Sequence, residues 1–126
     1  MFVREIVDGA TVVNQPAGHL EFGETLLEAV VREVREETRR AFTPRAVTGL
    51  YRWQAASGLT FMRVNFCGDA GDELVELERD ADILDTVWLD RESLLTENAR
   101  SPLVLRCVDD LLAQRCYPLE VLHDLT

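Results

Sequence analysis

Lysine is absent from this chain of 126 residues, and histidine occurs only twice. Without lysine the chain can form neither a Schiff-base intermediate nor the phosphate-binding loop of P-loop nucleotidases. His19 and His123 are too few for a HExxH zinc site, and they argue against a histidine-based nucleophilic triad. These absences exclude the first three kinds of catalytic site and make the fourth improbable.

Cysteine and long apolar runs are also scarce. Cys67, Cys107 and Cys116 are odd in number and show no CxxC spacing, so the sequence predicts buried, reduced thiols rather than a disulfide framework or a structural zinc site. No apolar stretch reaches membrane-spanning length, and charged residues follow Met1 too closely for a signal peptide. We therefore expect a cytoplasmic protein with no membrane partner.

Acidic residues outnumber basic ones, and the formal net charge is −10. Proteins that bind nucleic-acid polymers present basic surfaces to the phosphates, so this charge argues against such a partner. A small phosphorylated ligand stays compatible with an acidic chain, because bound cations dominate the field of such a site. The length and a hydrophobic content of 47% indicate one compact domain over residues 1–126.

The most informative segment, residues 18–37, predicts a capped amphipathic helix. Thr25 and Glu28 have the spacing of a capping box. The apolar positions recur with helical spacing and form a stripe that can be buried: Leu27, Val30, Val31, Val34 and Thr38. The run 14–18 before the helix is typical of a turn, and its Gly18 allows close approach of the backbone.

Three carboxylates, Glu33, Glu36 and Glu37, share one face of this helix beside the apolar stripe. Clustered carboxylates repel one another, and a hard divalent cation, which prefers oxygen ligands, would turn that repulsion into attraction. The alternative is a solvated surface helix, which i,i+4 pairs such as Glu36 with Arg40 support. The preceding turn favours the metal site, because a loop followed by such a helix can hold a phosphate chain.

The same segment resembles the signature of the Nudix hydrolase family, Gly-x5-Glu-x7-Arg-Glu-U-x-Glu-Glu-x-Gly-U, in which U is aliphatic. Seven specified positions match: Gly18, Glu24, Arg32, Glu33, Val34, Glu36 and Glu37. Two depart, since Arg39 stands where the signature has glycine and Arg40 where it has an aliphatic residue. Glycine there would cap the helix in the left-handed conformation, so we expect the helix to run on past Arg39 or to end differently.

The resemblance implies hydrolysis of phosphoanhydride bonds with Mg²⁺, or alternatively Mn²⁺, as the cofactor. By position, the metal ligands would be the carboxylates of Glu33, Glu36 and Glu37 and the main-chain carbonyl of Ala17. Glu24 and Arg32 would form a supporting pair that ties the loop to the helix.

The family often takes a general base, or a further ligand, from a downstream acidic loop. Asp82 is best placed for this catalytic role, with Asp80 and Glu78 behind it. The alternative is that these acids form an ordinary solvated loop.

Two arginines and a histidine are candidate contacts to the substrate phosphates. Arg63 and Arg4, each within an expected strand, can fork onto phosphate oxygens, although a surface ion pair is the commoner role of arginine. His19 either touches phosphate or forms a hydrogen bond within its own loop, and the sequence leaves both open.

Aromatic side chains supply the candidate contacts to a ring. Trp53 can stack on a base or a pyrimidine, with Phe61 and Tyr51 as weaker candidates. Trp88 is flanked by aliphatic residues, so we expect it in the core.

The stretches 14–21, 100–104 and 117–120 resemble a bacterial subfamily of Nudix phosphatases. That likeness implies a small phosphorylated substrate: nucleoside di- and triphosphates and the pyrophosphate of the thiamine pyrimidine. Sugar nucleotides and dinucleotides are the alternatives within the family. Two other classes stay open, a non-catalytic nucleotide sensor of Nudix fold and a structural interaction module whose properties would not depend on metal.

The order of the expected elements predicts an α/β fold, a Nudix-type α/β/α sandwich with a mixed β-sheet. Strands are expected at 2–7 and 10–13, joined by an Asp8-Gly9 turn, then at 45–55, 59–67 and 86–89, with an acidic loop at 68–82. Asp90 is expected to cap a short helix through residue 95, and Ser101-Pro102 to open the last helix.

Nudix domains normally have a full strand before the one expected at residue 2, so the first strand looks truncated. Either the start of the chain was assigned too far downstream, or another subunit supplies the missing edge. A bare strand edge attracts pairing, and we expect a monomer or a homodimer.

Overall fold

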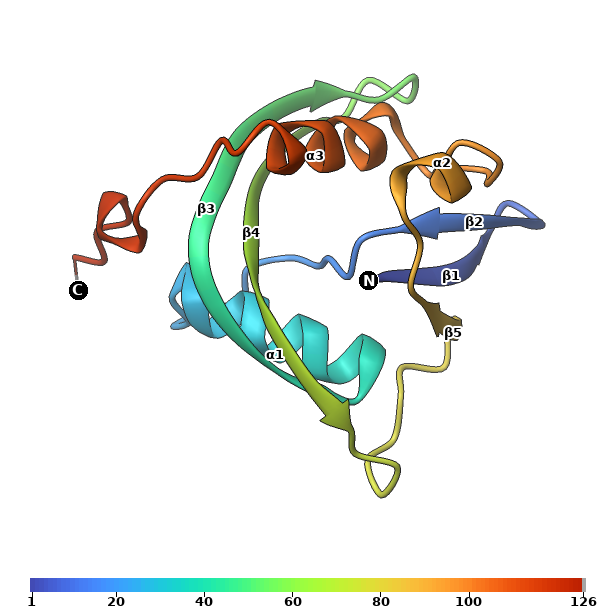
Figure 1. The fold of residues 1–126 in the computed structure, drawn as a ribbon, viewed down its shortest axis with the longest axis horizontal. Helices are drawn as coiled ribbons and strands as arrows, with labels where there is room; N and C mark the ends of the chain where they lie inside the picture. Colours follow the sequence, from blue (N-terminus) through green and yellow to red (C-terminus); the bar gives the residue numbers. More distant parts are fainter. Residues whose placement is uncertain (126) are drawn as a thin grey trace.

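The computed structural model describes residues 1–125. Its elements are β1 (Phe2–Val7), β2 (Ala10–Asn14), α1 (Leu26–Thr38), β3 (Arg40–Gln54), β4 (Thr60–Glu73), β5 (Ile83–Val87), α2 (Arg91–Leu94), α3 (Pro102–Leu112) and a 3-10 turn, η1 (Leu119–Val121). One sheet has the order β2-β1-β5, and β3 pairs with β4 in a second sheet. In Figure 1 the β3–β4 ribbon curves from α1 toward α3, with the smaller sheet on its concave side.

The α/β class is confirmed, but the strand pairings differ from a mixed sheet. Within residues 1–125 all paired strands are antiparallel, and parallel pairing is limited to a single bridge between Val13 and Ala99. The first hairpin has the expected turn, in which Asp8 and Gly9 both have positive φ. β1 is paired on both sides, with β2 and with β5. The bare edge expected at the first strand is therefore absent, and the edge strands are β2 and β5.

The second hairpin is longer than its sequence indicates. β3 begins at Arg40, directly after the helix, and β4 continues to Glu73. Irregular register at three points of the pair accommodates this length. Gly68 permits the close pairing of the two strands at this point. A Cβ at residue 68 would lie 2.1 Å from the Thr43 carbonyl oxygen, so any side chain there would clash with β3. The acidic loop is therefore confined to residues 74–82, rather than 68–82.

Trp88 contradicts the expectation of a core tryptophan. β5 covers residues 83–87 rather than 86–89, so Trp88 lies beyond the strand and is 62% exposed. The guanidinium of Arg40 lies 5.6 Å from the centre of its ring, a cation–π contact that covers part of the indole.

The hydrophobic core joins the small sheet to the C-terminal helices. Its central cluster is Phe2 of β1, Val13 of β2, Leu94 of α2 and Val104 of α3. Helix α1 buries Val34 and Thr38 as expected, whereas Val31 of the expected stripe is exposed. The buried face of α1 is rotated toward the carboxylates and includes Glu37.

The helix caps agree with the sequence except at the end of α1. The Thr25 hydroxyl accepts from the Glu28 N–H at 3.1 Å, and the Glu28 carboxylate accepts from the Thr25 N–H at 2.8 Å. Helix α1 stops at Thr38, and Arg39 takes the left-handed conformation, with φ of 58°. The helix thus does not run on: Arg39 closes it in the geometry expected of the signature glycine, and its side chain pairs with Glu73.

The two later helices begin as predicted. The Asp90 side chain accepts from the Ser93 N–H at the start of α2, and the Ser101 side chain accepts from the Leu103 N–H at the start of α3. None of the helices within residues 1–125 is long and apolar enough to cross a membrane.

All three cysteines are free thiols. Cys107 is buried and Cys67 is half-buried, but Cys116 is exposed, so the expectation of burial fails there.

Candidate active site

The loop between β2 and α1 folds back onto the carboxylate face of the helix. The Ala17 N–H donates to Oε2 of Glu37 at 3.1 Å. Gly18 lies directly against Glu33, because a Cβ at Gly18 would fall 1.9 Å from Glu33 Oε1. Any side chain at residue 18 would force the Glu33 carboxylate to move, so glycine there lets the loop backbone approach that carboxylate as it stands.

Arg32 joins the loop to the helix. It donates to Glu24 through Nε at 2.6 Å and through Nη2 at 3.0 Å, the bidentate geometry expected of this supporting pair. The same guanidinium donates to Glu33 at 2.8 Å, to Glu36 at 3.2 Å and to the His19 carbonyl at 3.0 Å. The hydrogen bond from Arg32 lowers the pKa of Glu24, and both ends of the loop are thus held to α1.

Glu37 is the most buried of the three helix carboxylates, with only 8% of the residue exposed. Burial raises its pKa to about 8, the Ala17 N–H opposes the rise, and the negative charges of Glu33, Glu5 and Asp80 add to it. An unpaired buried carboxylate with three acidic neighbours marks a point where positive charge is needed.

The donor set suits a hard divalent cation. Its groups are carboxylate oxygens and a loop backbone, which Mg²⁺ and Mn²⁺ prefer to nitrogen or sulfur. As the side chains stand, no three acidic, histidine or cysteine groups among residues 1–125 are close enough to hold a metal ion. In this arrangement Arg32 engages both Glu33 and Glu36.

The acidic loop reaches the helix through Asp80. The Asp80 N–H donates to the Glu36 carbonyl at 2.9 Å, and its carboxylate raises the pKa of Glu37. Asp82 is exposed, two residues further on, and its side chain takes part in none of the hydrogen bonds of residues 1–125. Asp80 is therefore the member of this loop that the fold brings to α1.

Sequence reasoning missed Glu5, which the small sheet places near Glu37. Its negative charge raises the pKa of Glu37, and it forms an ion pair with Arg100. The charged pair Arg4-Glu5 within a segment that is otherwise apolar was a usable signal, since departures from a local pattern tend to occur at functional sites.

The two candidate arginines have different surroundings. Arg63 of β4 donates to the side-chain oxygens of Gln15 at 3.2 Å and of Asn14 at 3.4 Å, next to the site loop. It forms no ion pair within the described part of the chain. Arg4 is held between Asp85 at 3.2 Å and Glu97 at 3.1 Å, so two carboxylates already compete for it.

The aromatic candidates also differ in their surroundings. Trp53 stacks on Phe61 across the ribbon, with ring centres 5.4 Å apart, which leaves one face of each ring for another partner. Tyr51 turns instead to α3, where its hydroxyl donates to Asp110 at 2.7 Å. Burial, followed by this hydrogen bond, raises the pKa of Tyr51. The His19 side chain is exposed, and only its carbonyl is tied to the helix.

Known proteins resemble this chain in sequence and in fold. The family model of the NUDIX domain matches residues 4–107. The phosphatase NudJ of Escherichia coli (strain K12) is 35% identical over 125 residues, which cover 98% of this chain and 82% of that protein. A NUDIX hydrolase from Nitrosomonas europaea superimposes with a TM-score of 0.94 at 38% identity, covering 98% of this chain and 86% of that one.

A more distant structure, the solution structure of the Escherichia coli ORF135 protein, shares the fold. Its TM-score is 0.65 at 18% identity, with 90% of this chain and 79% of that chain covered. With the family model matching most of the chain and the fold and a large part of the sequence shared with these relatives, this chain belongs to the Nudix family and is a Nudix hydrolase.

Proposed function

We propose that this hydrolase cleaves phosphoanhydride bonds in nucleoside di- and triphosphates and in the pyrophosphate of the thiamine pyrimidine, with Mg²⁺ as its metal and Mn²⁺ as a substitute. One observation carries the proposal: the loop with Ala17 and Gly18 is held against Glu33 and Glu37 on α1. A phosphate chain entering there meets backbone on one side and carboxylates on the other. The substrate classes follow from the likeness to NudJ-type sequences stated above.

Glu33, Glu36, Glu37 and the Ala17 carbonyl would hold the metal. A bound divalent cation supplies charge neutralisation of the phosphate oxygens and lowers the pKa of the attacking water. Arg32 would keep Glu24 through its bidentate contact if Glu33 and Glu36, which it now contacts singly, held the cation. The protein then loses no anchor between loop and helix.

Hydrolysis is expected to depend strictly on the divalent cation, because the bare carboxylate face repels a polyphosphate. The measurement is release of phosphate and pyrophosphate from a panel of nucleotides, sugar nucleotides, dinucleotides and the thiamine pyrimidine pyrophosphate, with Mg²⁺ and with excess chelator. A chelator already saturated with Mg²⁺ is the control. Undiminished turnover in excess chelator contradicts the metal assignment, and turnover confined to sugar nucleotides or dinucleotides contradicts the proposed substrates.

Asp82 remains our proposed general base, and Asp80 is the alternative because its backbone is bonded to α1. Replacing the base with asparagine is expected to lower turnover by roughly 100-fold, since general bases contribute about 10²- to 10⁴-fold. The other of the two Asn variants should keep most of its activity and serves as the matched control. Near-normal turnover of both variants would place the base outside this loop.

Ring recognition through Trp53 is expected to be permissive. Stacking on a base contributes about 1 to 3 kcal/mol and tolerates different rings, so Trp53→Ala should weaken binding of all ring types by a similar factor. Trp88→Ala, which removes an exposed indole covered by Arg40, is the matched control and should leave binding unchanged. A loss confined to one base would show that the pocket reads base identity. KM values measured across the panel distinguish a uniform loss of binding from a loss confined to one base.

A further inference from the structure

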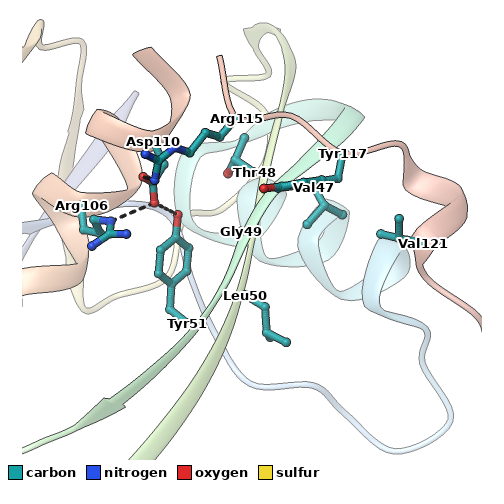
Figure 2. Close-up of a pocket in the computed structure, with 10 residues that line it drawn as sticks. All are labelled: Val47, Thr48, Gly49, Leu50, Tyr51, Arg106, Asp110, Arg115, Tyr117 and Val121. Atoms are coloured by element: carbon teal, nitrogen blue, oxygen red, sulfur yellow. Dashed lines mark hydrogen bonds and ion pairs between the residues drawn. The ribbon is translucent and has the colours of Figure 1, made fainter. Parts of the chain in front are cut away.

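A second polar cluster lies apart from the carboxylate face, in an open cavity of about 510 Å³ between β3, α3 and the C-terminal segment (Figure 2). Its lining is about equally polar and apolar, and the apolar part includes Val47 and Leu50 of β3 and Tyr117 and Val121 of the C-terminal segment. None of the residues that line it belongs to the proposed hydrolytic site.

One buried carboxylate organises the polar end of this cavity. Asp110 accepts from Arg106 Nε at 3.0 Å on one oxygen and from Arg115 Nη1 at 2.9 Å on the other. The Tyr51 hydroxyl donates to the same carboxylate. Figure 2 shows the three side chains converging on Asp110. Those hydrogen bonds, the one from Tyr51 first, lower the pKa of Asp110, so its charge is maintained.

The strand is shaped to hold this cluster. A Cβ at Gly49 would lie 2.5 Å from the Tyr51 hydroxyl, so the tyrosine lies across a position that carries no side chain. On the opposite wall, Tyr117 exchanges two backbone hydrogen bonds with Val47, at 2.9 and 2.8 Å. The segment that follows Arg115 is therefore held to β3, while Arg106 projects from helix α3.

The two guanidinium groups retain donors for a ligand. The side chains of Arg106 and Arg115 are 61% and 56% exposed, and within residues 1–125 each donates to protein through only one nitrogen. Two positive charges against one negative charge leave a local surplus of one, in a chain whose net charge is −10. Planar guanidinium groups match the paired oxygens of carboxylates and phosphates.

We propose that this cavity binds a small organic anion, a phosphate monoester or a carboxylate carried on an apolar or aromatic body. Arg106 and Arg115 hold the anionic group, and the apolar walls around Leu50 and Tyr117 cover the body. The site is separate from the proposed hydrolytic site and requires no metal.

The test is binding of phenyl phosphate and of benzoate to the full chain in excess chelator, where the bare carboxylate face of α1 repels anions. Amide chemical shifts and calorimetry should both report saturable binding, with the largest shifts in residues 47–51 and 115–121. Benzyl alcohol, which keeps the ring without the charge, should not bind, and inorganic phosphate should bind more weakly than phenyl phosphate. Slower amide exchange over 115–122 is expected with the ligand.

The double variant Arg106→Gln and Arg115→Gln should weaken binding by roughly tenfold or more. Arg45→Gln is the matched control, because Arg45 of β3 is likewise paired with an aspartate, Asp69, but lies outside the cavity. Leu50→Glu adds a carboxylate to the wall without touching Asp110, and should weaken binding even if the double variant folds poorly. No saturation below about 10 mM, equal weakening in Arg45→Gln, or shifts centred on α1 would each overturn the proposal.

Discussion

Glu37→Gln is expected to abolish hydrolysis and, in metal-free protein, to raise stability at alkaline pH. Glutamine forms helices as well as glutamate does, so the fold should persist. Turnover should fall by roughly 100-fold or more, because a carboxylate oxygen is lost from the proposed metal site. Stability should rise because the variant no longer buries a charge beside Glu33, Glu5 and Asp80.

The pH dependence of this gain follows from the raised pKa of Glu37. Below about pH 4.5 the carboxyl is protonated in both folded and unfolded protein, and wild type and variant should be equally stable on this account. Between about 4.5 and about 8 the unfolded state loses the proton first, so wild-type stability falls as pH rises through this window. Above pH 8 this decrease in the wild-type free energy of unfolding is complete, and it amounts to roughly 3 to 5 kcal/mol for a pKa displaced this far.

Melting temperatures of both proteins in chelator, measured from pH 5 to pH 9, check this result. Glu36→Gln is the matched variant: its carboxylate is much more exposed, so it should lose activity without the same gain in stability. A difference in melting temperature that does not grow with pH would contradict the burial argument. Near-normal turnover of Glu37→Gln would show that Glu37 is not a metal ligand.

Arg32→Ala should lower both stability and turnover, because the Arg32 guanidinium bonds to Glu24 of the loop and to two carboxylates of α1. Its removal leaves Glu24 and Glu33 without their cation and releases the His19 carbonyl. Partly buried carboxylates left unpaired are destabilising, and a fall in melting temperature of roughly 5 °C or more is expected. With the loop released, turnover should fall even at saturating Mg²⁺.

Two further variants separate charge from geometry. Arg32→Lys keeps the positive charge but cannot bridge Glu24 through two parallel hydrogen bonds, so it should restore only part of the stability. Arg35→Ala removes an exposed arginine of the same helix that makes no ion pair among residues 1–125, and should change little. Equal melting temperatures for Arg32→Ala and Arg35→Ala would rule out the connecting role.

The helix cap at Arg39 departs from the local preference for glycine in the left-handed conformation. A non-glycine residue in the left-handed conformation costs roughly 1 to 2 kcal/mol, which is why the helix was expected to end differently. The cap nevertheless forms, with the Arg39 N–H bonded to the Arg35 carbonyl and its guanidinium bonded to Glu73 of β4. Contacts with a distant strand offset a local preference.

The sequence by itself determined the features that depend on near neighbours. The capping box at Thr25, the Asp8-Gly9 turn and the caps at Asp90 and Ser101 each rely on groups within about four residues. The register of acids on α1 is likewise a property of helix periodicity. The pairing of Glu24 with Arg32, eight residues apart, was implied instead by the resemblance to the Nudix signature.

Only the tertiary structure decided which of these groups are buried and what meets them. Glu37 lies inside, rather than at the rim, because α1 packs on the face that carries it. Glu5 and Asp80 reach it from segments more than 30 residues away, and Arg4 is taken by acids from β5 and beyond. Local periodicity sets which residues share a face, but the packing of distant elements sets what that face contacts, and with it the charge of the site.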